Sequence, residues 1–224
     1  MAIEKTVFTQ TAGANRLAEV RAWFAANATG FFDEITEISS NKFNCKKDNK
    51  IVLRFGTGIT DSEIRLSNGT TLRLLQIASD FSPQYAVKTS KGFMIHWTDG
   101  GSNYAIPNSL FVTESSDGGI VVTFMGTVNE TSNYNVFFSC DFDKSTAFAY
   151  YIKTSIDSSG ISSYKEKIYI AASMTVFQPV PCNNVNSYGV GVYQMYYSQY
   201  PGIEGSLSAD GKNYYSSGYL ALEE

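Results

Sequence analysis

The sequence predicts a mainly β protein, with antiparallel sandwich or barrel-like sheets and one amphipathic helix near the N-terminus. About a dozen short segments alternate apolar and polar residues, and turns containing glycine or asparagine separate them. Aromatic residues make up 14% of the chain and charged residues only 17%, a balance that favours half-buried strands over a disordered chain. Strands do not alternate with helices, which argues against a parallel α/β sheet.

The one expected helix spans residues 14–28. Leu17, Val20 and Phe24 recur at helical spacing and form an apolar stripe, which Trp23 widens. The charged residues of the segment fall outside this stripe. The spacing therefore predicts an amphipathic helix with one buried face.

After residue 30 the pattern becomes that of strands joined by tight turns. The clearest hairpin is "SEIRLSNGTTLRLLQI", where Asn68-Gly69 is a dipeptide that favours positive φ at both turn positions. The same arrangement recurs around Lys91-Gly92 and around residues 117–119. Further strands are expected in "YNVFFSCDF", "AFAYYIKTS", "KIYIAASMTVF", "GVGVYQMYY" and "YLAL".

The length of 224 residues fits one large domain or two small ones. We expect an N-terminal segment with the helix, residues 1–30, followed by a single antiparallel β domain, residues 31–224. A soft boundary near residues 79–83 ("SDFSP") is the alternative to one continuous unit.

Charge and hydropathy exclude several classes of partner. The net charge is −4 and no basic run exceeds Lys46-Lys47, so we expect no nucleic-acid partner. The N-terminus lacks a signal-peptide pattern, and apolar runs reach only about six residues, whereas a membrane-spanning helix needs about 20. We therefore expect synthesis in a cytoplasm and no membrane insertion. Cys45, Cys140 and Cys182 show no C-x-x-C spacing and are expected to be buried thiols.

Residues with catalytic potential are few. The single histidine, His96, lies on a predicted strand, where a structural or surface role is favoured over a catalytic one. Asp141 and Asp143 would share a strand face, about 6.5–7 Å apart, a spacing compatible with acid–base chemistry on a sugar. Because "DFDKST" also has the composition of a turn capped by aspartates, the turn is the favoured interpretation. We expect no enzyme activity, no metal site and no cofactor.

Surface tyrosines are the remaining candidates for a functional site. Successive strand residues face opposite ways, so a tyrosine-rich strand cannot send every ring into one core. Rings left outside suit protein interfaces, whereas stacking on sugars and internal packing are the alternatives. The candidate interface or ligand-stacking residues are Tyr193, Tyr196, Tyr197, Tyr200, Tyr214, Tyr215 and Tyr219.

Three segments carry a resemblance to a known group of proteins. They are "VRAWFAANATGFFDEI", "LFVTESSDGGIVVTF" and the C-terminal "GSLSADGKNYYSSGYLAL". Together they resemble the small virion proteins encoded in tail or structural gene clusters of phages and prophages of Gram-positive bacteria. The segment "SIDSSGISSYKEKIY" departs from that pattern. The resemblance implies a particle component and supplies no catalytic residues.

The function expected from the sequence is therefore that of a structural component of a tailed-phage particle, in the tail tip, baseplate or neck. Its expected partners are other virion proteins and further copies of itself. A host-surface glycan-binding module is the alternative, and a glycan-degrading enzyme is a more remote one.

The C-terminal segment is expected to form a terminal hairpin from residues 207–214 and 219–222, and one interpretation places this hairpin at a sheet edge. It would either close the sheet or offer backbone to a neighbouring subunit. Under the second interpretation, deletion of the residues after Ser206 leaves a folded but assembly-defective chain. Aggregation of the truncated chain would instead indicate that these strands belong to the core.

Overall fold

The computed structural model describes residues 3–10, 13–57, 62–69, 71–73, 83–97, 108–127, 134–143, 146–153, 175–181, 188–196, 204–209, 211–217 and 220–224. These residues form a mainly β protein with antiparallel sheets and one short helix, which confirms the predicted fold class. The helix is α1 (Ala14–Asn27), and the strands are β1 (Glu4–Val7), β2 (Glu34–Ser39), β3 (Lys42–Lys47), β4 (Lys50–Gly56), β5 (Glu63–Arg65), β6 (Thr71–Arg73), β7 (Pro83–Lys88), β8 (Gly92–Trp97), β9 (Asn108–Glu114), β10 (Ile120–Thr127), β11 (Tyr134–Asp141), β12 (Thr146–Lys153), β13 (Thr175–Pro181), β14 (Tyr188–Tyr196), β15 (Glu204–Ala209), β16 (Lys212–Ser217) and β17 (Leu220–Glu223).

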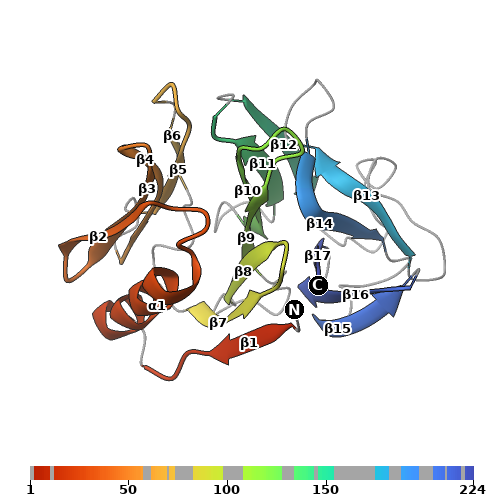
Figure 1. Cartoon of the computed structure of the whole chain (residues 1–224), viewed down its shortest axis with the longest axis horizontal. Helices are drawn as coiled ribbons and strands as arrows, with labels where there is room; N and C mark the ends of the chain where they lie inside the picture. Colours follow the sequence, from red (N-terminus) through yellow and green to blue (C-terminus); the bar gives the residue numbers. More distant parts are fainter. Residues whose placement is uncertain are drawn as a thin grey trace.

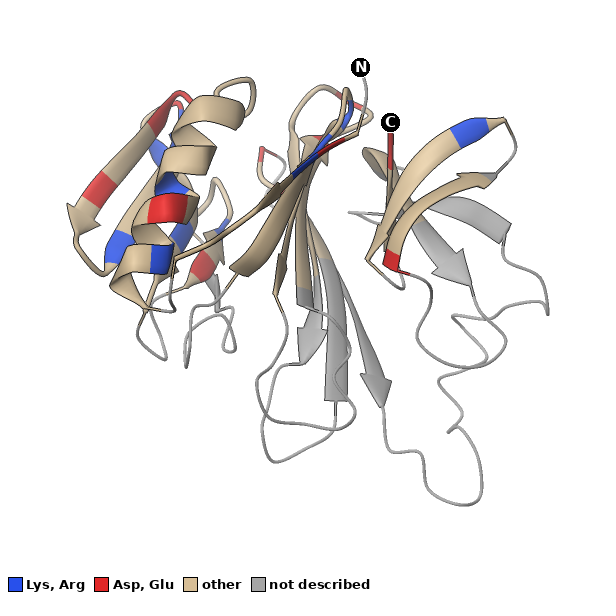
Figure 2. Cartoon of the chain, turned by 90° about the horizontal axis from the view of Figure 1, so that it is seen from below, with Lys and Arg blue, Asp and Glu red and all other residues tan. Residues whose placement is uncertain are grey.

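The described strands form three sheets (Figure 1). The central sheet has the order β1-β7-β8-β9-β10-β11-β12, and the N-terminal sheet is the meander β2-β3-β4-β5-β6. The C-terminal sheet has the order β13-β14-β17-β16-β15. Figure 2 shows the central sheet between the other two, with α1 on the side of the N-terminal sheet.

The larger core lies between the central sheet, α1 and the N-terminal sheet. The apolar stripe of α1 is buried as predicted, and Phe24 at its centre is 0% exposed. The Phe24 ring lies 5.2 Å from the ring of Phe93 on β8 and 5.3 Å from that of Phe55 on β4, measured between centroids. This one helical residue therefore joins both sheets, because its ring packs against each of them.

The smaller core lies on the opposite face of the central sheet. Met94 on β8 and Phe111 on β9 pack there with Val192 and Leu222 of the C-terminal sheet. Because successive strand residues face opposite ways, β8 sends Phe93 toward the helix and Met94 toward the C-terminal sheet. This strand is consequently buried along its whole length.

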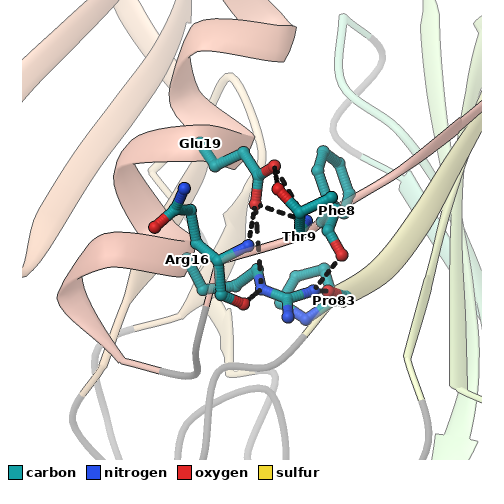
Figure 3. Close-up of polar contacts among 6 residues, drawn as sticks. Phe8, Thr9, Arg16, Glu19 and Pro83 are labelled. Carbon is teal, nitrogen blue, oxygen red and sulfur yellow. Dashed lines mark hydrogen bonds and ion pairs between the residues drawn. The ribbon is translucent and has the colours of Figure 1, made fainter.

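Polar contacts fix the connection between β1 and α1 (Figure 3). The Glu19 carboxylate accepts hydrogen bonds from the backbone N–H groups of Thr9, at 2.9 Å, and Gln10, at 3.0 Å. The Arg16 side chain donates to the carbonyl of Gln10 at 2.6 Å and also to that of Pro83. Two residues of one helix thus hold the connecting chain and the first residue of β7.

The predicted hairpins are present, with one correction. Ile64 of β5 pairs with Leu72 of β6 around Asn68-Gly69, but only Gly69 has positive φ there, at 90°. The loop is longer than the expected two-residue turn. Both central residues have positive φ instead at Asp48 (49°) and Asn49 (60°), which join β3 to β4. This second turn was not predicted from the sequence.

The other two hairpins follow the prediction. Strands β7 and β8 pair on either side of the turn before Gly92, and β9 and β10 pair around residues 117–119. The division into residues 1–30 and 31–224 stays a prediction. Strand β1, from the first segment, pairs with β7 of the second. The proposed soft boundary lies outside the described residues, except for Pro83.

The C-terminal strands β16 and β17 pair with each other, but the last strand does not lie at a sheet edge. Strand β17 lies between β14 and β16, so the last strand is internal. Leu220, Ala221 and Leu222 are 2%, 0% and 0% exposed. The strand at this edge of the C-terminal sheet is β15, which comes before β16 and β17 in the sequence. The prediction that deletion after Ser206 leaves a folded chain is therefore wrong in its premise, since the deletion removes core strands.

Candidate functional site

A group of polar side chains joins the central sheet to the edge of the C-terminal sheet. We call it the inter-sheet cluster and define it as Lys5 of β1, Tyr85 of β7, His96 of β8, Glu204 of β15 and Tyr215 of β16. Figure 1 shows these strands on the same side of the molecule, near both chain ends. The cluster is assembled from residues up to 210 positions apart in the sequence.

His96 lies at the centre of the inter-sheet cluster and is 0% exposed. Its ring stacks on Tyr85, with centroids 4.6 Å apart and planes at 17°. Its Nδ1 lies 3.3 Å from Ser109 Oγ, and its Nε2 lies 3.9 Å from a carboxylate oxygen of Glu204. Among the described residues Nε2 has no hydrogen-bond partner. Burial lowers the pKa of His96 to about 4; Glu204 opposes this shift and Lys5 adds to it. The imidazole is consequently neutral at pH 7.

The two tyrosines link the sheets through hydrogen bonds. Tyr85 donates its hydroxyl hydrogen to Glu204. Lys5 Nζ donates to Tyr215 Oη at 2.8 Å and lies 3.9 Å from the centroid of the Tyr85 ring, in a cation–π contact. Burial, and then the bond to Glu204, raise the pKa of the Tyr85 hydroxyl well above its usual range. Tyr85 therefore stays a neutral donor, and Glu204 is held against the central sheet.

Ser109, His96 and Glu204 are the residue types of a hydrolytic triad, but their arrangement differs from one that serves a substrate. Such a triad requires a hydroxyl that a substrate carbonyl can approach. Ser109 is 0% exposed, and Tyr85 covers the imidazole ring. The geometry therefore supports a role in holding two sheets together.

A shallow groove lies beside the inter-sheet cluster, where the first described residues of the chain meet the end of the C-terminal sheet. Its volume is about 420 Å³. Its walls carry hydroxyl, amide and carboxylate groups next to two apolar side chains. The lining residues are Ile3, Ser206, Leu207, Ser208, Asn213 and Glu224.

The outer face of the C-terminal sheet holds a second polar group. Tyr193 donates its hydroxyl hydrogen to Glu223 at 2.7 Å, and Lys212 Nζ donates to the same carboxylate oxygen at 3.1 Å. Burial and the bond to Glu223 raise the pKa of Tyr193 to about 12. The Tyr193 ring also packs edge-on against Tyr214, with centroids 5.6 Å apart.

These contacts change the interpretation of the candidate tyrosines. Tyr214 and Tyr215 are only 3% and 5% exposed, because they pack on opposite faces of an internal strand. Both are thereby removed from the set of surface rings, and internal packing accounts for them. Tyr193 is half-buried. Tyr196 is the last residue of β14, and only its backbone is described. Tyr197, Tyr200 and Tyr219 lie outside the described residues.

The two aspartates do not form a pair with His96. Asp141 is 1% exposed at the end of β11, three strands from β8 in the central sheet, or about 14 Å at ordinary strand spacing. Asp143 is exposed, and its carboxylate accepts a hydrogen bond from the backbone N–H of Ile120 at 3.2 Å. This contact agrees with the turn interpretation of "DFDKST".

Two of the three cysteines behave as predicted. Cys45 and Cys140 are buried thiols, and burial raises the pKa of the Cys45 thiol well above its usual range. Cys182 lies outside the described residues. Within the described ranges, no three histidine, cysteine or acidic side chains gather in a way that could hold a metal ion. No helix in this part of the chain has the length and hydropathy to cross a membrane.

Four residues of this site were not predicted from the sequence: Lys5, Tyr85 and Glu204 of the inter-sheet cluster, and Ser109 beside His96. The predicted hairpin around Lys91-Gly92 contained a signal for one of them, because it brings Tyr85 opposite His96. Lys5 and Glu204 come from distant segments, and no local pattern marks them. Neither a family of known proteins, nor a curated protein, nor a solved structure matches the chain.

Proposed function

We propose that this protein is a structural component of a tailed-bacteriophage particle and acts through protein–protein assembly in the tail tip, baseplate or neck. It is made in the cytoplasm of the bacterial host and resides in the virion. Its partners are other virion proteins and further copies of itself. The resemblance of its N-terminal, middle and C-terminal segments to small virion proteins supports this proposal.

The observation that carries the proposal is the set of open sheet edges. Each of the three sheets ends in two strands that have a neighbour on one side only, among the described strands. An edge strand presents backbone N–H and C=O groups to any extended segment that reaches it. Strand addition of this kind suits a protein whose role is to contact neighbours in a particle.

Association with particles tests this function. Particles purified from the host by density-gradient centrifugation are expected to contain the protein, and gold-labelled antibody is expected to mark the tail tip, baseplate or neck. Deletion of the gene is expected to yield incomplete particles, and expression from a plasmid should restore complete ones. Complete, infectious particles from the deletion strain would contradict the proposal, as would protein found only in the soluble fraction.

A further inference from the structure

The open edge of the C-terminal sheet, strand β15, differs from other edges of the molecule. Edge strands are usually protected from pairing by charges, prolines or bulges. Strand β1 carries Glu4 and Lys5, and β2 carries two exposed glutamates. Strand β13 contains two prolines and two register shifts. The sequence of β15, "EGSLSA", has neither proline nor lysine.

The single charge of β15 is directed away from the edge. Glu204 accepts the hydroxyl hydrogen of Tyr85 and lies 3.9 Å from His96 Nε2, so its carboxylate points into the inter-sheet cluster. The inter-sheet cluster thus holds the only charged side chain of β15 on the face toward the central sheet, where 42% of this side chain stays exposed. It also fixes the strand against the central sheet.

The hydrogen-bond pattern shows which backbone groups of β15 face outward. The N–H of Glu224 donates to the carbonyl of Asn213 at 2.9 Å, so Asn213 directs its backbone groups toward β17. Backbone groups alternate in direction along a strand, so the next residue, Tyr214, directs its own toward β15. Tyr214 is paired with Leu207.

The same alternation then applies within β15. Leu207 directs its N–H and C=O inward, toward β16, and Gly205 does likewise. Glu204, Ser206 and Ser208 therefore direct their backbone groups outward, where β15 has no further strand partner among the described residues. This row of donors and acceptors contains no proline, and Gly205 within the strand has a φ of 128°, a conformation that favours glycine.

We propose that β15 pairs antiparallel with β15 of a second copy of this chain, so that two C-terminal sheets join into one continuous sheet around a two-fold axis. The inference rests on the proposed assembly function, because it names the partner of one open edge. A two-fold arrangement uses the same surface on both copies and requires that surface to be self-complementary.

The side chains of β15 meet this requirement in one register. With Ser206 opposite Ser206 of the second copy, Glu204 lies opposite Ser208, and Gly205 lies opposite Leu207. A Cβ added at Gly205 would have no atom within 4 Å, so there is space for the facing leucine. Leu207 is half-buried in the single chain, and the facing glycine leaves room for its side chain. No two charges of β15 face each other in this pairing.

Ser208→Pro tests the pairing, with Ser208→Ala as the matched control. Both variants lose the hydroxyl bond to Asn213, 2.8 Å long and exposed. Only proline also removes the outward N–H, and it does so in both copies. Loss of two hydrogen bonds per dimer is expected to raise the dimer Kd by roughly tenfold or more.

Light scattering after size exclusion is the measurement. The unmodified chain and Ser208→Ala are expected at about twice the chain mass of 24.7 kDa, and Ser208→Pro at the mass of one chain. All three should give the same circular dichroism spectrum. A monomeric unmodified chain, or an equally dimeric Ser208→Pro chain, would overturn the proposal. Particle association is measured separately, so the assembly function stands or falls independently.

Cross-linking tests the register. In a chain that also carries Cys182→Ser, Ser206→Cys is expected to form a covalent dimer under mild oxidation, because directly opposed residues have Cα atoms about 5.5 Å apart. Ser208→Cys is the control, since its two copies would lie about 14 Å apart. Equal cross-linking at both positions, or none at Ser206→Cys, would contradict this register.

Discussion

At the scale of single residues, the most informative group is His96. The sequence indicated a structural or surface histidine, because the residue lies on an alternating strand. Its complete burial and its stacking on Tyr85 agree with the structural alternative. Its distant neighbours Lys5 and Glu204 could not have been predicted, because the pairing of remote segments decides which side chains meet. The sequence therefore indicated a non-catalytic role for His96 but neither the inter-sheet cluster nor the residues that surround this histidine.

Burial of His96 has a consequence for stability as a function of pH. Its pKa is about 4 in the folded chain, compared with the ordinary value of 6.5. The unfolded chain therefore binds a proton below pH 6.5, whereas the folded chain does not until about pH 4. The stability that this group contributes is present above pH 6.5 and is lost as pH falls to 4. At 1.36 kcal/mol per pKa unit, the loss is roughly 3 kcal/mol.

We expect His96→Gln to remove this part of the pH dependence. The charged and titratable groups that face His96 are Lys5, Tyr85 and Glu204, with Tyr215 behind Lys5, and the substitution leaves all of them in place. Urea unfolding at several pH values between 4 and 7.5 gives the free energy for both chains. Equal slopes of stability against pH in the two chains would contradict the assignment to His96.

At the scale of secondary-structure elements, alternation and turn residues predicted most of what was observed. Hairpins around Asn68-Gly69, Lys91-Gly92 and residues 117–119 are local, so their sequences contain enough information to place them. The predicted two-residue turn at Asn68-Gly69 is wrong, because this dipeptide lies in a longer loop between β5 and β6. The turn at Asp48-Asn49 lacks glycine and was therefore missed.

Gly92, at the start of β8, shows how tightly one hairpin lies against the next strand. A Cβ at this position would be 2.2 Å from the carbonyl oxygen of Val112 and 2.7 Å from Cγ2 of Thr113 on β9. Gly92→Ala is therefore expected to separate β8 from β9 locally and to reduce the free energy of unfolding by about 1–3 kcal/mol.

Gly30 provides the matched control for this substitution. Nothing lies within 4 Å of a Cβ added there, and its φ is not positive. Gly30→Ala should change the free energy of unfolding by no more than about 0.5 kcal/mol. Urea denaturation of both variants measures the difference. A Gly92→Ala chain as stable as the unmodified one would show that β9 does not approach this closely.

At the scale of the whole molecule, the layered arrangement could not be read from the sequence. The sequence predicted antiparallel strands, but the position of β17 between β14 and β16 depends on pairing between non-consecutive segments. The burial of β8 on both faces likewise depends on which sheets cover it. The prediction that Tyr214 and Tyr215 lie at the surface is wrong for the same reason, since an exposed edge strand and an internal strand can have the same composition.

The central position of β17 predicts that the chain needs its C-terminal segment in order to fold. Deletion of residues 207–224 removes β16 and β17, together with the fully buried Leu222 and the nearly buried Tyr215. Both pack in the core shared with Met94 and Phe111 of the central sheet. The truncated chain would expose that face, and loss of a single buried leucine already costs about 2–5 kcal/mol.

We therefore expect the truncated chain to aggregate or to bind a dye that reports exposed apolar surface. Leu222→Ala in the full chain is the milder test and should reduce the free energy of unfolding by about 2–5 kcal/mol. Ser208→Ala is the control, because this exposed residue belongs to the edge and not to the core. A soluble, cooperatively unfolding truncated chain would mean that the central sheet is stable without its C-terminal partner. In that case the truncated chain would keep only residues 204–206 of β15 and would lack β16, so the edge proposed for assembly would be lost while the rest of the fold remained.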